Sequence, residues 1–330
     1  MKLIVDAMGG DKAPQEIVQG CIDAAREFNL KIILVGREDV LERELTSRNA
    51  PKENFQLIHA EEVIGAEESP VMAIRRKKDS SMVKAVELLK EYRDGVVISA
   101  GNSGALMASG LLKAGRIDGI DRPALAPLIP TRNMRGTLLL DAGANTDCKS
   151  DNLMQFAQMG SIYMEKVMGR SNPSVALLNI GHEETKGNEL VKEAFKRLKE
   201  IKSINFVGNL EPRDVLNGSV DVLVCDGFVG NVVLKLIEGV AFSLFGMIKE
   251  EFMATPISKL GALMLKSRLK NIKGKMDYAE HGGAPLLGIN GGIIKAHGSS
   301  DARAIKNAIR QGKIFSDQAV LDSIRSFARI

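Results

Sequence analysis

The chain has 330 residues, 45% of them hydrophobic and 26% charged, an ordinary globular composition that is long enough for one large α/β domain or two smaller ones. Its 45 Lys and Arg against 41 Asp and Glu leave a net charge of +4, too small an excess to indicate a nucleic-acid-binding protein, and the lack of Trp weakens any case for base stacking. Three distant cysteines, Cys21, Cys148 and Cys225, form neither a disulfide framework nor a zinc motif and fit a reducing cytosol.

The first predicted element is a strand, Leu3–Asp6, because its apolar run is too short for a signal peptide. Further short runs rich in Val, Ile and Leu are Ile32–Gly36, Phe55–His59, Val96–Ala100, Thr137–Asp141, Val175–Ile180, Asn205–Gly208 and Val220–Cys225. Continuous apolar runs indicate strands buried on both faces. Their alternation with helical patterns predicts an α/β fold, a mostly parallel sheet with helices on both faces.

Helical patterns fill the spaces between these strands. They include Pro14–Phe28, a helix capped by Ser150 or Asp151 that ends near Met168, and Asn188–Glu200. A Gly-rich segment, Glu280–Gly298, and two final helices complete the chain.

Residues 228–275 differ from the rest because they contain no strand pattern. They predict two helices, about Gly230–Met253 and Ile257–Ile272, joined at Ala254–Pro256. We interpret them as a helical hairpin that protrudes from a single α/β domain of residues 1–330. No stretch approaches the length of a transmembrane helix, so we expect any membrane contact to be peripheral.

The loops that follow strands are the candidate binding segments, because ligands of open parallel sheets bind beyond the carboxyl ends of the strands. The best local signal is Gly101-Asn102-Ser103-Gly104, where a buried strand enters a helix, Ala105–Ala114. Free N–H groups at such a helix start attract phosphate; the alternative is a plain turn. No Walker A loop and no full GxGxxG motif is present, so nucleotide binding has no direct support.

Small and acidic residues after three other strands are candidate substrate ligands. They are Asp6, Gly9, Gly10, Asp11, Asn145 and Asp226. A carboxylate such as Asp6 can order a phosphate loop or orient a base, while the alternative for Asp11 is a helix cap. Several acids at one sheet edge could hold Mg²⁺, but ligand spacing across loops cannot be read from sequence, and we predict no metal.

Three further residues are candidates for catalysis, each with a structural alternative. Lys186, in a loop between strand and helix, can neutralise phosphate or stabilise an oxyanion, or can be a solvated loop lysine. Asn231 can donate to a carbonyl oxygen or cap a helix. His297, in His-Gly-Ser-Ser-Asp, can shuttle a proton or bind phosphate, or can simply pack within its loop.

Two basic clusters stand out. They are Arg75-Arg76-Lys77-Lys78 and, on the predicted hairpin, Lys266, Arg268, Lys270, Lys273 and Lys275. Each can be a solvated face, or can contact an acidic protein or anionic lipid. The hairpin tip, Met253–Leu260, is apolar enough to enter a bilayer interface.

Taken in order, the loop motifs resemble those of the bacterial phosphate acyltransferases that make acyl-phosphate from acyl-carrier protein. The matching segments are Asp6–Asp11 with Pro14, Ser99–Ala105, Asp141–Asn145, Asn179–Gly181 with Lys186, Asp226–Asn231, Gly283–Gly288 and His297–Ser299. The resemblance implies a fold like isopropylmalate dehydrogenase and phosphotransacetylase. It also implies acyl transfer from acyl-carrier protein to inorganic phosphate, with no cofactor.

The same resemblance implies partners and a location. The product would feed a membrane glycerol-3-phosphate acyltransferase in phospholipid synthesis. A homodimer built on the hairpin, in the cytoplasm and peripherally associated with the membrane, would also follow.

One mechanism and two rival interpretations remain at this point. In the mechanism, Gly101–Ser103 and Lys186 hold phosphate, Asn231 and Lys186 stabilise the oxyanion, and His297 or a nearby acid manages protons. The first rival is a serine hydrolase with Ser103, Asp226 and His281 or His297, although Ala105 replaces the second glycine of a nucleophile elbow. The second is a non-enzymatic adaptor that binds the carrier protein or a membrane.

Overall fold

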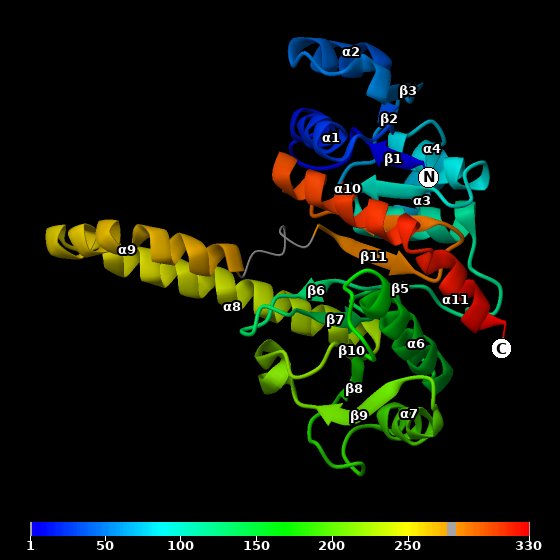
Figure 1. The fold of residues 1–330 in the computed structure, drawn as a ribbon, viewed down its shortest axis with the longest axis vertical. Helices are drawn as coiled ribbons and strands as arrows, with labels where there is room; N and C mark the ends of the chain where they lie inside the picture. The colour runs from blue at the N-terminus through cyan, green and yellow to red at the C-terminus, as the bar shows by residue number, and fades with distance from the viewer. Residues whose placement is uncertain (1, 276–281, 330) are drawn as a thin grey trace.

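The computed structural model describes residues 2–275 and 282–329. Its strands form two sheets, which lie one above the other in Figure 1, and a pair of long helices extends to one side. The mixed α/β class with mostly parallel strands and helices on both faces is confirmed. The sequence suggested a single sheet, whereas the structure has two. The strands share the same apolar pattern, and this pattern does not show which strands pair with each other.

The first sheet has seven strands, most of them parallel. Their order is β3 (Phe55–His59), β2 (Ile32–Gly36), β1 (Leu3–Asp6), β4 (Val96–Ser99), β12 (Gly292–Lys295), β11 (Ala284–Leu287) and β5 (Ala124–Leu125). Only β11 runs antiparallel to its neighbours, β12 and β5. β11 and β12 were not predicted from the sequence, since glycines interrupt the apolar pattern of the segment that contains them.

The second sheet has five strands, and all pairs except β6–β7 are parallel. Their order is β6 (Leu128–Ile129), β7 (Thr137–Leu140), β10 (Val222–Val224), β8 (Ser174–Leu178) and β9 (Asn205–Leu210). Because β7, β10 and β8 are parallel, the loops after them lie at one edge of this sheet.

Helices cover both faces of the first sheet. Side chains of β1 alternate: Leu3 and Val5 pack with α1 (Gln15–Phe28) and α10 (Ala302–Asp317), while Ile4 packs with α4 (Ser81–Glu87) and α5 (Ser103–Ser109). Gly20 lets α1 and α10 approach closely, because a Cβ there would lie 2.6 Å from the Ala302 carbonyl oxygen. The other helices are α2 (Glu38–Ser47), α3 (Pro70–Arg76) and α11 (Val320–Ala328).

Two helices bury one face of the second sheet, α6 (Ser150–Lys166) and α7 (Glu189–Glu200). Their apolar residues join those of α1 and α10 in one cluster that runs through both sheets. The opposite face packs against the first turns of α8, through Val233, Leu234 and Ile237. The start of α8 therefore belongs to the sheet, although most of the helix does not.

The protruding pair consists of α8 (Gly227–Met253) and α9 (Pro256–Lys275), which lie side by side in Figure 1. The expectation that no stretch approaches membrane-spanning length is wrong for α8, which is long and apolar enough by length and composition alone. The length of this apolar helix is hidden in the sequence because Lys235 and Glu238 interrupt the apolar run. Only 6% of the most apolar 18-residue stretch of α8 is buried. The helix therefore exposes most of its apolar surface in the single chain.

Candidate active site

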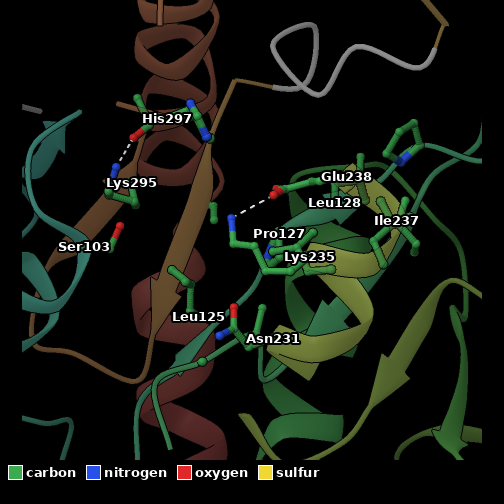
Figure 2. A pocket seen from close by; sticks show the side chains of 18 of the residues that line it. Ser103, Leu125, Pro127, Leu128, Asn231, Lys235, Ile237, Glu238, Lys295 and His297 are labelled. Atoms are coloured by element: carbon green, nitrogen blue, oxygen red, sulfur yellow. Dashed lines mark hydrogen bonds and ion pairs between the residues drawn. The ribbon is translucent and has the colours of Figure 1, made fainter. Parts of the chain in front are cut away.

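A cavity of about 580 Å³ lies where the carboxyl ends of the first sheet face the start of α8. One side of it carries Ser103, Lys295 and His297, and the other carries Asn231 and Lys235 (Figure 2). Polar groups from segments that are distant in the chain therefore converge on one space, as a substrate site requires.

One wall is held by the loops after three neighbouring strands of the first sheet, β1, β4 and β12, and the loop after β1 contributes none of the lining residues. The Asp11 N–H donates to the Gly298 carbonyl oxygen at 2.8 Å and joins the first and last of these loops. Gly9 and Gly10 permit the contact with the middle loop. A Cβ on Gly9 would lie 2.8 Å from the Gly101 nitrogen, and Gly10 has a φ of +110°. These glycines bring the loops together and do not line the cavity.

Asp6 supports this wall from within the protein. Its carboxylate accepts hydrogen bonds from the Ser99 hydroxyl at 2.7 Å and the Met8 N–H at 3.3 Å. Burial raises the pKa of Asp6, and hydrogen bonds from Ser81, Ser99 and the backbone oppose that rise. Asp6 therefore holds the loop that follows β1 through its hydrogen bonds and does not itself line the cavity.

Lys295, which the sequence analysis missed, is the lysine of this wall. It ends β12, lines the cavity and donates to the carbonyl oxygens of Ala296 and, at 3.5 Å, Ala100. Burial lowers its pKa to about 8, although the carboxylates of Asp6 and Asp11 act in the opposite direction. A signal was present in the sequence, since a lysine directly after the apolar pair Ile293-Ile294 is easily desolvated.

His297 follows Lys295 by two residues and also lines the cavity. Its Nδ1 lies 2.9 Å from the Ser299 hydroxyl. Partial burial and the neighbouring Lys295 charge lower the pKa of His297, which favours the neutral imidazole. A neutral imidazole in contact with the cavity can accept or deliver a proton.

In the turn after β4, some residues stabilise the fold and one lines the cavity. The Asn102 side chain caps α5 by accepting from the Ala105 N–H at 3.0 Å, and its amide donates to the carbonyl oxygens of Gly65, Ala66 and Glu68. Its polar atoms are thus committed to the protein. The next residue, Ser103, lines the cavity. Gly101 lies behind it and donates its N–H to the Ser99 hydroxyl at 3.1 Å.

The opposite wall forms where α8 packs on the loop after β7. Gly227 and Gly230 allow this contact, because a Cβ on Gly230 would lie only 1.8 Å from the Asp141 carbonyl oxygen. Asn231 follows and lies against Gly143, whose Cβ would come 3.6 Å from that of Asn231. Asn231 lines the cavity, and its predicted catalytic role stays a prediction.

Asn145 and Asp226 hold this wall in place. The Asn145 side-chain amide donates to the Pro123 carbonyl oxygen at 2.7 Å and to the buried Asp141 carboxylate at 2.9 Å. Asp226 caps α8 by accepting from the Val229 N–H at 2.9 Å. Neither lines the cavity, and the substrate-binding role expected of both stays a prediction.

Lys186 lies elsewhere on the same edge of the second sheet. Its loop follows β8, its side chain is exposed and it does not line the cavity. The loop is held by Asn179, whose amide donates to the Lys186 carbonyl oxygen at 3.0 Å. The catalytic role of Lys186 stays a prediction.

Beyond its polar end the cavity has an apolar wall. That wall is built by Leu125, Pro127, Leu128, Ile129 and Pro130 around β5 and β6, and by Leu234, Ile237, Ala241 and Phe242 of α8. Lys235 and Glu238, from the same helix, form an ion pair of 2.7 Å at the cavity. One end of the space therefore suits an anion, and the rest suits a hydrocarbon chain.

The serine hydrolase constellation gains little from this geometry. Asp226 serves as a helix cap, and the Nδ1 atom of His297 faces Ser299, whereas a triad needs that ring atom to meet a carboxylate. The other candidate histidine, His281, lies outside the described residues.

Residues 1–322 match the sequence model of a family described as "Fatty acid synthesis protein". The phosphate acyltransferase of Clostridioides difficile (strain 630) is 51% identical over 99% of this chain and 96% of its own length. That of Alkaliphilus oremlandii (strain OhILAs) is 55% identical over 98% and 96%.

Solved structures agree on the fold. The phosphotransacetylase from Streptococcus pyogenes has a TM-score of 0.64 at 17% identity and covers 98% of this chain and 94% of its own. For the branched-chain phosphotransacylase from Enterococcus faecalis V583, the TM-score is 0.56 at 12% identity, with 96% and 99% covered. At these identities only the fold is shown, whereas the two full-length relatives above 50% identity show that this chain is an acyltransferase of the phosphate acyltransferase family.

Proposed function

We propose that the cavity transfers a fatty acyl group from acyl-carrier protein to inorganic phosphate, giving acyl-phosphate for phospholipid synthesis and free carrier protein. The observation that carries this proposal is the cavity itself, in which a desolvated lysine, Lys295, faces an apolar wall. An ammonium group suits phosphate, and the wall suits the acyl chain.

In the reaction a phosphate oxygen attacks the thioester carbonyl, the carbon–sulfur bond breaks, and the proton of hydrogen phosphate ends on the leaving sulfur. Lys295 and the Ser103 hydroxyl hold the phosphate, and Asn231, on the opposite wall, donates to the developing oxyanion. His297 relays the proton in its neutral form. Phosphate is already a nucleophile, so holding the two substrates together supplies much of the acceleration.

The hairpin supports a proposal about location. α8 and α9 expose large apolar side chains that include Phe242, Ile257 and Met264. Such a surface suits a second copy of the chain or the boundary of a bilayer. We therefore place the protein in the cytoplasm as a homodimer that associates peripherally with the membrane, where a glycerol-3-phosphate acyltransferase would use its product.

The test is a phosphate-dependent release assay with purified protein and acyl-carrier protein loaded with a long-chain acyl group. We expect free carrier thiol to form only when phosphate is present, together with an equal amount of acyl-phosphate trapped as hydroxamate by hydroxylamine. Thiol release without phosphate would show a hydrolase. No release by folded protein would leave the adaptor interpretation.

A further inference from the structure

We propose that the carrier protein docks on the outer face of α3, a surface formed by Val71, Met72, Arg75 and Arg76. This proposal rests on the proposed function, since it names where the acyl donor binds. It is carried by the exposure of this face, by its unpaired charge and by its attachment to the wall that contains Ser103.

The α3 face combines apolar and cationic side chains in one small area. Val71 and Met72 are 44% and 45% exposed, whereas Ala73 and Ile74, on the inner side of the same helix, are buried in the core. Residues four apart lie next to each other on a helix, so Val71 adjoins Arg75, and Met72 adjoins Arg76. A helix of seven residues that needed only to cover the core would not require two large apolar side chains on its outer side.

Among the described residues, none forms an ion pair with the two arginines of this face. Lys77, from the same cluster, pairs with Glu68 at 2.6 Å. Arg75 and Arg76 are exposed, and neither has an ion pair with any residue of the described part of the chain. An exposed arginine that forms no ion pair with the described residues can offer its planar donors to a carboxylate on another molecule.

α3 is joined to the active site by direct packing. Pro70, its first residue, lies against Gly104, where a Cβ would come 2.6 Å from the proline Cγ. Gly104 follows Ser103, which lines the cavity. The loop before α3 is fastened to the same turn, because the Asn102 amide donates to the carbonyl oxygens of Gly65, Ala66 and Glu68 at 3.2, 2.9 and 3.1 Å. A protein bound to α3 would thus sit beside the phosphate end of the cavity.

An acidic carrier protein fits this face better than a membrane does. Arginines next to a small apolar patch are typical of a protein interface, in which charge guides encounter and the apolar centre supplies affinity. The larger apolar surface, and so the better candidate for a bilayer, is the hairpin. The Lys266 and Arg268 cluster lies on α9, and no described residue of α9 lines the cavity.

The experiment compares the full-length wild type with Arg75→Glu/Arg76→Glu and with a matched control, Lys90→Glu/Arg93→Glu. The control makes the same change in net charge at exposed residues just before β4. These residues lie at the amino end of that strand, whereas Ser103 and the cavity lie beyond its carboxyl end. Each protein is assayed with acyl-carrier protein and with the same acyl group on pantetheine, a thioester that has no carrier protein.

We expect Arg75→Glu/Arg76→Glu to raise the KM for acyl-carrier protein at least tenfold, with kcat/KM for acyl-pantetheine unchanged and the control close to wild type. Added salt should raise the wild-type KM for acyl-carrier protein and so reduce the difference in KM between the wild type and Arg75→Glu/Arg76→Glu. An unchanged KM, or an equal rise in the control, overturns the docking site. So does loss of binding to anionic phospholipid vesicles with carrier kinetics intact, which would assign the face to a membrane. Wild-type protein that shows no phosphate-dependent release would overturn the proposed function itself.

Discussion

Replacing Lys295 by Met tests the active site most directly, because it removes one charge and keeps most of the side-chain volume. If Lys295 holds the phosphate, its loss resembles the removal of one oxyanion-binding donor, so kcat/KM for phosphate should fall by about 10²–10³. The KM for acyl-carrier protein should change little, since the apolar wall and the α3 face remain.

The same substitution should stabilise the fold. Burial lowers the pKa of Lys295 from the ordinary 10.5 to about 8, and at ~1.4 kcal/mol for each tenfold change this corresponds to a cost of at most about 3–4 kcal/mol for keeping the ammonium buried. The unfolded chain binds more protons than the folded one between those pKa values, so wild-type stability contains a contribution that rises from pH 8 to 10.5. Lys295→Met should be more stable than wild type at pH 7 and should lack that rise.

Steady-state kinetics with varied phosphate, and urea unfolding at pH 7 and pH 10, measure the two effects. Lys90→Met, an exposed lysine away from the cavity, is the matched control and should change neither. Wild-type kinetics in Lys295→Met would show that Lys295 does not hold the phosphate. Loss of activity in Lys186→Met alone would then assign the phosphate to the lysine that the sequence singled out.

Three further predictions concern the pH dependence of phosphate binding and the opposite wall of the cavity, where α8 packs on the loop after β7. Because the free ammonium of Lys295 is lost above pH 8, the KM for phosphate should rise toward tenfold per pH unit there, and a flat profile to pH 10 would contradict its role. Gly230→Ala should unfold at a much lower temperature, since its Cβ would meet the Asp141 carbonyl oxygen at 1.8 Å, whereas Gly239→Ala, with open space around it, should gain about 0.5–1 kcal/mol; equal melting temperatures would refute the close packing. Asp226→Ala should cost about 1 kcal/mol of stability, and Asp226→Ser, another capping residue, should restore both stability and turnover. Turnover that stays low in the stable serine variant would give Asp226 a chemical role.

Much of the fold can be predicted from the sequence because local patterns dictate it. β1, β2 and β3 end where their apolar runs end, and the two hairpin helices lie within a few residues of their predicted bounds. The strand pair β11 and β12 is different, since glycines break its pattern and pairing with distant strands stabilises it.

The ordered set of loop motifs was also sufficient to predict the family, since each motif keeps its place in the chain. The sequence did not show which motif residues hold the loops together and which line the cavity. Asn102, Asn145 and Asp226 use their side chains to hold the loops, which depends on carbonyl and N–H groups that are remote in sequence or arranged by the fold.

What the sequence alone determined was the class of fold, the hairpin and the set of loops that form the site, because each follows from local periodicity or motif order. Only the tertiary structure decided that the strands divide into two sheets and that Lys295 faces Asn231 across a partly apolar cavity. The physical reason is that desolvation and contact depend on neighbours brought together by folding. A lysine that looks ordinary in the chain becomes a phosphate-binding candidate only when burial lowers its pKa beside an open cavity.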